Sequence, residues 1–323
     1  MIGDVDLRPD VFAVVMATGI ISISALDHHY SLISDTLAVL ATAALIVLIV
    51  LVVLKLVVRR TVAFHHLDEP DAALRLFTFV AACAVLAARF EPHRPPFWVF
   101  GTAAVLAWLA LVPIAMRGIA IRGVDELRGG ARGAWLLASV ATSGVAIVLA
   151  DAARLTGHRV LVGMAATVWA LAVIGYGATV WLIAGGVVAD RSVSARAEPD
   201  SWILMGGLAI ASLAGNHVYR ALGVSSPLRD GVKIATIAIW VLASLWIPVL
   251  VWLSGRRVNA RTGSVGIAAW WAMVFPLGMY STTTEATSID ARLPALSVIS
   301  LVFMWIGLAV WLVVAFATTR GWR

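Results

Sequence analysis

The sequence predicts an all-α polytopic membrane protein, with about ten transmembrane helices arranged as five helical hairpins in a single domain over residues 1–323. Hydrophobic residues make up 61% of the chain and charged residues 13%, a balance that excludes an ordinary soluble domain. The apolar stretches approach the ~20 residues that a membrane-spanning helix needs. Short loops separate them, and none of these loops has the composition of a separate soluble domain.

Polar and apolar spans alternate along the chain, and this alternation predicts their positions. Small and hydroxyl residues are concentrated in five spans, at 11–26, 75–89, 135–151, 202–220 and 268–287. The spans between them, such as 37–58 and 294–317, carry hardly any polar atoms. Because a hydroxyl-rich helix gains little by facing acyl chains, we expect the five polar spans to face protein or water. The pattern predicts an inner ring of helices around a polar path and an outer ring that faces membrane lipids.

The first span is expected to remain in the mature protein. Asp4 and Asp6 occupy the region where a cleavable signal peptide carries basic residues. The third span holds the single cysteine, Cys83, which can form no internal disulfide and is interpreted as a small buried residue. Neither a disulfide framework nor a cysteine-rich metal site is expected.

The ninth span contains the most informative local sequence, Phe275-Pro276-Leu277-Gly278. Proline removes a backbone donor and displaces the carbonyl four residues earlier, so a bend beside Phe275 is expected. A bulky ring next to a bend can swing into an axial path, although ordinary packing is the alternative role. Ser281, Thr284 and Glu285 share one helical face by their spacing and would extend that path with polar groups.

Basic residues predict the orientation in the membrane. They gather in the loops on the side of both termini, as at Lys55 to Arg60 and at Arg117 to Arg132, whereas the other side has fewer, including Arg292. The positive-inside rule therefore predicts a multi-pass protein of the cell membrane with both termini in the cytoplasm. The formal charge of +6 mostly reflects this topology, so nucleic acid is not an expected partner.

A few ionisable residues lie within or at the ends of the polar spans. An ionised carboxylate at mid-membrane depth costs at least ~2.5 kcal/mol, so Glu285 should be protonated, paired or close to an aqueous mouth. If Glu285 titrates, it could couple protons to a carboxylate substrate. Arg75 and Arg220 are candidate anion-recruiting residues, with interfacial snorkelling as the alternative role. His217 lies beside the face shared by Asn216 and Arg220, with a hydrogen-bonded core histidine as its alternative.

Other chemistries find little support in the sequence. The adjacent pairs His28-His29 and His65-His66 point in different directions on a helix and lack a metal-ligand spacing, so no metal site is predicted. No phosphate-binding glycine loop occurs, and no cofactor is expected. A membrane-embedded enzyme would need clustered acids and bases, but Asp151, His217 and Glu285 lie on three different spans. The protein is therefore not expected to be an enzyme.

Two stretches resemble one known family of membrane proteins. Trp270-Trp271 followed by Phe275-Pro276-Leu277-Gly278 and a Ser/Thr-rich run is similar to the ninth helix of the tellurite-resistance/dicarboxylate transporter family. Residues 12–24, which read FAVVMATGIISIS, are similar to the first helix of that family. The family includes plant slow anion channels, bacterial tellurite-resistance channels, fungal malate permeases and sulfite exporters.

This resemblance implies five helical hairpins around a central pore in each protomer, commonly in a homotrimer. It also implies that Phe275 occludes the pore. The pore-lining residues would come from the polar spans. They are Thr18, Gly19, Ser22, Thr78, Ser139, Thr142, Ser143, Ser212, Asn216, Pro276, Ser281 and Thr284.

The expected function is membrane transport of small anions. C4-dicarboxylates such as malate or succinate are the first candidates, followed by tellurite, sulfite, chloride and nitrate. The alternative is a proton-coupled dicarboxylate carrier, or a sulfite or tellurite exporter, in which Glu285 or His217 titrates. Hydroxyl dipoles suit a path in which an anion is partly dehydrated without being held too tightly to leave.

Overall fold

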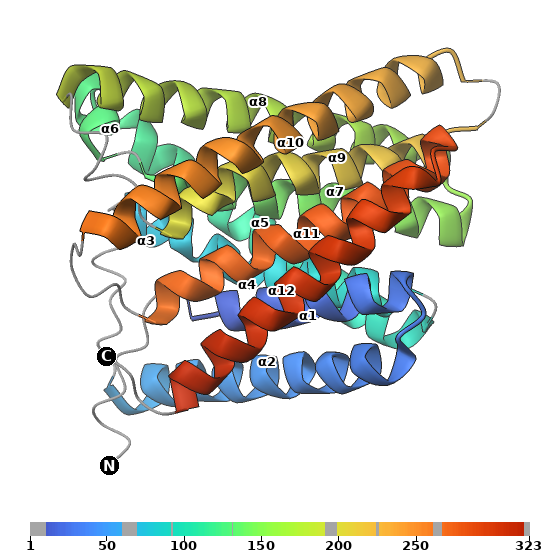
Figure 1. Ribbon diagram of the computed structural model, residues 1–323, viewed down its shortest axis with the longest axis horizontal. Helices are drawn as coiled ribbons and strands as arrows, with labels where there is room; N and C mark the ends of the chain where they lie inside the picture. The colour runs from blue at the N-terminus through green and yellow to red at the C-terminus, as the bar shows by residue number, and fades with distance from the viewer. Residues whose placement is uncertain are drawn as a thin grey trace.

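The computed structural model is built from helices (Figure 1). It describes residues 11–59, 70–91, 93–130, 132–190, 199–223, 226–260 and 267–319. Throughout these ranges every regular element is helical, so the predicted all-α class is confirmed. Asp4, Asp6, Arg60 and the pair His65-His66 lie outside the described residues.

Five helices come from the polar spans and form the buried part of the bundle. Their bounds are Ala13–Asp27 for α1, Phe77–Arg89 for α4, Leu137–Thr156 for α7, Ile203–Ala221 for α9 and Ile267–Ala291 for α11. Each packs against two others, so that α1, α4, α7, α9 and α11 close into a ring in chain order. We call this set the inner ring.

Five longer or more apolar helices pack outside the inner ring. Their bounds are Ser31–Arg59 for α2, Arg94–Ala120 for α5, Arg159–Asp190 for α8, Arg229–Ala260 for α10 and Ala295–Thr319 for α12. Each packs most closely against the ring helix that precedes it in the chain. Four short helical segments lie between these helices. Three of them, α3 (Pro70–Arg75), η2 (Gly133–Leu136) and η4 (Pro199–Trp202), lead into the ring helices α4, α7 and α9. The fourth, α6 (Val124–Gly130), lies between α5 and η2.

Within the described residues, six helices are long and apolar enough to cross a membrane. The five outer helices supply five of these, and only 17–28% of each apolar window is buried inside the protein. The sixth, Gly133–Thr156, belongs to the inner ring and is 89% buried. The apolar surface therefore points outward, as expected for helices that face lipid. Crossing of the membrane by ten helices stays a prediction.

Glycines allow the ring helices to approach one another closely. A Cβ atom added at Gly19, Gly144, Gly206 or Gly278 would come within 2.8 Å of a side chain on the neighbouring ring helix. Small residues let helices pack closely in a bilayer, where burial of apolar surface gives helices little reason to associate. These contacts set the rotation of each ring helix about its own axis.

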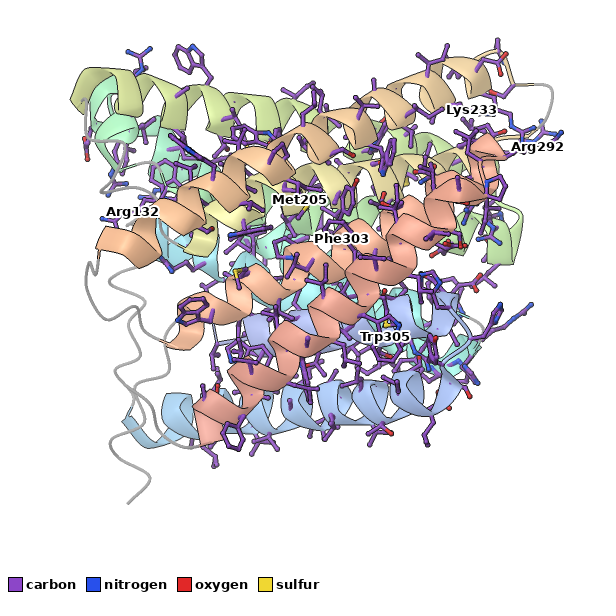
Figure 2. All side chains as sticks on the ribbon, in the orientation of Figure 1. Arg132, Met205, Lys233, Arg292, Phe303 and Trp305 are labelled. Atoms are coloured by element: carbon purple, nitrogen blue, oxygen red, sulfur yellow. The ribbon has the colours of Figure 1, made fainter. Side chains whose placement is uncertain are left out.

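The ring helices all run in the same direction (Figure 1). Figure 2 shows Arg132 at the end of the bundle where they begin, and Arg292 with Lys233 at the end where they finish. Arg132 and Arg292, which the charge pattern assigned to opposite sides, thus lie at opposite ends. Which end faces the cytoplasm stays a prediction.

Candidate functional site

Phe275 lies on α11, which packs between α1 and α9 in the inner ring. Its side chain is fully buried, at 0% exposure. The next residue, Pro276, is inside α11, and its ring lies against Gly206 of α9. On the other side of α11, Gly278 faces Ile20 and Ile21 of α1. Two tight helix contacts therefore hold the backbone on either side of the Phe275 ring.

Most hydroxyls of the predicted lining residues reach toward an outer helix. Ser139 donates to the carbonyl of Ala172 in α8, and Ser212 donates to the carbonyl of Thr236 in α10. Three others accept a hydrogen bond from a tryptophan indole of an outer helix. These pairs are Thr18 with Trp311, Thr142 with Trp108 and Thr284 with Trp240.

Two serine pairs join an inner to an outer helix by reciprocal bonds. Ser22 of α1 donates to the Ser34 carbonyl at 2.7 Å, and Ser34 donates back to the Ser22 carbonyl at 2.7 Å. Ser281 of α11 and Ser300 of α12 repeat the arrangement at 2.7 and 2.8 Å. Ser281 also accepts from Ser24 of α1 at 2.6 Å.

The remaining predicted lining residues are spread around the ring. Asn216 donates to Thr287 of α11 at 3.3 Å, and Thr78 donates to the carbonyl of Arg75 at 2.8 Å. Gly19 packs against Val85. The Ser143 hydroxyl is buried without a hydrogen-bond partner. The hydroxyls of Thr282 and Thr283 on α11, which were not among the predicted lining residues, are buried in the same way.

Ionisable residues gather where the ring helices end. Each ring helix supplies at least one in its last two turns, among them Asp27, Arg89, Asp151, His217 and Glu285; Arg154, Arg220 and Asp290 lie beside them on α7, α9 and α11. The five residues named first are called the terminal ring below. His217 and Glu285 were predicted from the sequence as coupling residues, whereas Asp27 and Arg89 were not. The available signal was that every polar span approaches its end with an ionisable residue.

Four ion pairs compensate the basic members and neighbours of the terminal ring. Arg89 is buried, bonds Asp35 of α2 at 2.6 Å, and also donates to Ser22 and Ser34. Asp151 lies 2.7 Å from His217 Nδ1 and 3.4 Å from Arg154. On α9, Arg220 bonds both oxygens of Asp290, at 3.0 and 3.1 Å. These pairs connect ring helices to one another and to α2.

Asp27 and Glu285 differ from the other members of the terminal ring. One oxygen of each carboxylate, Oδ2 of Asp27 and Oε2 of Glu285, is buried without a hydrogen-bond partner. Neither residue forms an ion pair in the part of the chain that the structure describes.

Histidine and cysteine side chains contribute little further chemistry here. Over the described ranges, no group of three or more His, Cys, Asp or Glu residues is placed to hold a metal ion. His28, just beyond α1, lies 2.8 Å from the Ser300 hydroxyl, and burial lowers the pKa of its imidazole. Cys83 is buried in α4 as a free thiol.

Comparison with known proteins gives two results. A family model described as voltage-dependent anion channel matches residues 6–319. Two uncharacterized membrane proteins of Mycobacterium tuberculosis, from strains CDC 1551 / Oshkosh and ATCC 25618 / H37Rv, are each 34% identical to this chain over 119 residues. The match covers 35% of this chain and 59% of either relative, so it spans less than two thirds of their length.

Proposed function

We propose that this chain, which belongs to the voltage-dependent anion channel family, conducts small anions across the cell membrane along the axis of the inner ring, with Phe275 as the gate. C4-dicarboxylates such as malate or succinate are the first candidate substrates, and tellurite, sulfite, chloride and nitrate are simpler ones. In this proposal ten helices cross the membrane as five hairpins, both termini are cytoplasmic, and the protomers form a homotrimer.

The full burial of Phe275, on one helix of a closed ring of five, is the observation that supports the proposal. The contacts of Pro276 with Gly206 and of Gly278 with Ile20 fix the backbone around it. With a fixed backbone, rotation of the Phe275 side chain is the smallest motion that could open an axial path. Side-chain rotation is also much faster than a rearrangement of packed helices.

The lining of the path is proposed from the hydroxyls that the packing leaves unpaired. Ser143, Thr282 and Thr283 are buried and have no hydrogen-bond partner. Thr282 lies two turns after Phe275, so both residues share one face of α11. Hydroxyl dipoles can replace part of the hydration shell of an anion and let it leave again. The other predicted hydroxyls would act mainly by holding ring helices to outer helices.

Anion flux into liposomes tests the gate. Purified protein and its Phe275→Ala variant would be compared at a fixed membrane potential with chloride, nitrate, malate and succinate. We expect the variant to raise flux at least about tenfold, which corresponds to a barrier lower by about 1.4 kcal/mol. Phe303→Ala is a matched control, because Phe303 lies on the outer helix α12 (Figure 2). Its ring packs edge-on against that of Tyr280. Equal flux in all three proteins would contradict the gate.

A proton-coupled carrier on the same scaffold is the second candidate. The unpaired Glu285 oxygen and the contact of His217 with Asp151 favour it, since both are groups that can exchange a proton. Large voltage-driven currents in Phe275→Ala would support a channel. Small, saturable dicarboxylate uptake that needs a proton gradient would support the carrier.

A further inference from the structure

We propose that His217, held in place by Asp151, binds a small oxyanion together with one proton inside the inner ring. The proton and the anion meet at Nε2 of the His217 imidazole. The inference rests on the proposed function for its consequence, which is acid-stimulated flux, but binding itself can be measured without any flux. It deepens that function by naming the site at which a transported anion is held.

The contact between His217 and Asp151 is the first argument. His217 Nδ1 lies 2.7 Å from Oδ1 of Asp151, and this contact joins α9 to its neighbour α7. An ionised carboxylate can only accept, so the hydrogen of this bond belongs to Nδ1. Nε2 is therefore the nitrogen that remains to take up a proton. It forms no hydrogen bond with any of the residues that the structure describes.

The direction of the His217 side chain is the second argument. Two residues earlier, a Cβ atom added at Gly215 would meet Thr236 of α10 and Trp169 of α8, so that side of α9 faces the outer helices. Ser212 donates to the carbonyl of Thr236 on the same side. Two residues correspond to a rotation of about 200° around a helix, so His217 points toward the inside of the ring. Its side chain keeps 17% exposure and can be reached by an ion.

The burial of Asp151 is the third argument. Its side chain is only 1% exposed, and its Oδ2 atom is buried without a hydrogen-bond partner. A buried carboxylate is costly unless an opposite charge lies beside it. Arg154 compensates this charge only in part, since it approaches Asp151 to 3.4 Å and is 42% exposed. A proton on His217 Nε2 would make the imidazole a full counterion for the carboxylate.

The other basic residues on α9 and α10 already have partners. Arg220 of α9 bonds both oxygens of Asp290 from α11. Arg229 and Lys233 of α10 lie over the ring of Tyr219. These cations are engaged elsewhere, so the positive charge that an anion needs at the imidazole has to come from the added proton.

The remaining charged residues on helices packed against α9 point away from it or are exposed. Thr287 of α11 faces α9, where it accepts a hydrogen bond from Asn216. Glu285 lies two residues before Thr287, which turns it by about 200° from that face. Asp230 of α10 and Arg159 of α8 are exposed in the first turns of their helices. Proton binding at the imidazole therefore depends mainly on the bonded carboxylate and on the anion.

A protonated imidazole and an oxyanion form a charge-assisted hydrogen bond. Nε2–H donates to one oxygen of the anion, while Nδ1–H keeps its bond to Asp151. The new N–H bond forms with a proton from the surrounding water or buffer, and no other covalent bond changes. Because the proton and a monovalent anion carry opposite charges, their joint binding adds no net charge to the desolvated interior. This balance is the reason to expect one proton with each anion.

The position of His217 relates this site to the gate. Gly206 of α9 packs against Pro276, the neighbour of Phe275. His217 follows Gly206 by eleven residues, or about 16 Å along the helix axis. An anion that has passed Phe275 would therefore meet the imidazole before it leaves the ring at the end where the helices finish. Acidification is expected to increase flux, because it supplies the proton that holds the anion.

Proton uptake during anion binding tests the site directly. Purified protein in weak buffer at about pH 7, where a free imidazole is mostly neutral, would be titrated with sodium nitrate. Nitrate carries no proton of its own, so a pH-indicator dye reports only the protons that the protein binds. We expect an uptake that approaches about one proton per protein at saturation, and none in His217→Gln. The matched control is His158→Gln, which changes an exposed histidine just before α8 and should keep the uptake.

Two results would overturn the proposal. One is that the unmodified protein takes up no proton as nitrate is added, which can be decided even if a variant fails to fold. The other is that His217→Gln binds nitrate with the same proton uptake as the unmodified protein, since the anion would then be held elsewhere.

Asp151→Asn tests the positioning role of Asp151. The amide oxygen can still accept from Nδ1 of His217, but the negative charge is gone. With saturating nitrate, we expect the pH of half-maximal proton binding to fall by about one unit or more, because the protonated ring loses the opposite charge beside it. A residue that only shaped the fold would not move this midpoint, so an unchanged midpoint would contradict the role of Asp151.

Flux in the Phe275→Ala background tests the consequence. We expect flux to rise about fivefold or more between about pH 7.5 and about pH 5.5, and by less than about twofold when His217→Gln is added. Absence of any anion flux in Phe275→Ala would contradict the proposed function, while proton uptake would still report on the binding site. Normal flux together with no proton uptake would leave the anion path standing and remove the site at His217.

Discussion

The neighbouring helices α11 and α12 are 25 residues long each, yet they place their polar and apolar side chains in opposite ways. In α11, Ser281, Thr282, Thr283 and Thr284 are all at most 5% exposed. In α12, the exposed surface is made of large apolar side chains such as Val302, Leu312 and Val313. The polar helix is inside and the apolar one outside, which is the arrangement expected when lipid, not water, surrounds the protein.

This contrast indicates which interactions stabilise such a bundle. Apolar surface gains nothing by moving from lipid tails to a protein interior of similar polarity. Close contacts at glycines and hydrogen bonds between helices must therefore provide much of the stability. Both are concentrated on the inner helices, so substitutions on the inner ring should cost far more than the same substitutions on the outer helices.

A leucine in place of an inner glycine should have the largest effect. A Cβ atom at position 278 would lie 2.8 Å from Ile21 and 2.9 Å from Ile20. We expect Gly278→Leu to lower the free energy of unfolding by about 3 kcal/mol, because overpacking forces side chains and backbone apart. Gly177→Leu on α8 is the control, since an added Cβ there meets nothing within 4 Å. Thermal unfolding in detergent would measure both, and similar losses would remove the distinction between inner and outer helices.

The alternation of polar and apolar spans was enough to predict which helices are buried. The five polar spans are the five helices that close the inner ring. The prediction succeeded because hydroxyl groups and glycines stabilise a membrane protein little when they face lipid. A helix that is rich in them is therefore buried among other helices. The family was also predicted, from residues 12–24 and from Phe275-Pro276 with its neighbours.

The direction in which individual side chains point could not be predicted from the sequence. Ser139 and Ser143 lie one turn apart on α7, yet Ser139 bonds α8 and Ser143 has no partner. Their difference depends on how α7 is rotated, which contacts such as Gly144 with Ala84 determine. The charge pairs could not be predicted either. Arg89 and Asp35 are 54 residues apart in the sequence, and they meet only because α4 packs beside the α1–α2 pair.

Loss of the buried arginine should have an intermediate effect. Arg89→Met removes the bonds to Ser22, Ser34 and Asp35 that tie α4 to the α1–α2 pair. We expect the free energy of unfolding to fall by about 1–2 kcal/mol. The cost stays below that of a fully buried ion pair because the Asp35 side chain is 71% exposed and can be hydrated when left alone.

The control for this variant is Arg159→Met at the start of the outer helix α8, where the arginine is exposed. Its thermal unfolding should match that of the unmodified protein. A larger loss of unfolding free energy in Arg159→Met than in Arg89→Met would contradict the expectation that substitutions on the inner ring cost more than those on the outer helices.

The serine pair between α11 and α12 should give the smallest measurable effect. Ser281→Ala and Ser300→Ala each remove one of two reciprocal bonds, and hydrogen bonds between membrane helices contribute on average about 0.6 kcal/mol. A double-mutant cycle isolates the coupling between the two side chains, which should be favourable because the two hydroxyl oxygens also lie 3.2 Å apart. Thr36→Ala on α2 is the control, since this exposed hydroxyl bonds only the carbonyl of Leu32 in its own helix. Single substitutions that leave the free energy of unfolding unchanged would mean that these two hydroxyls do not stabilise the packing of α11 against its outer neighbour.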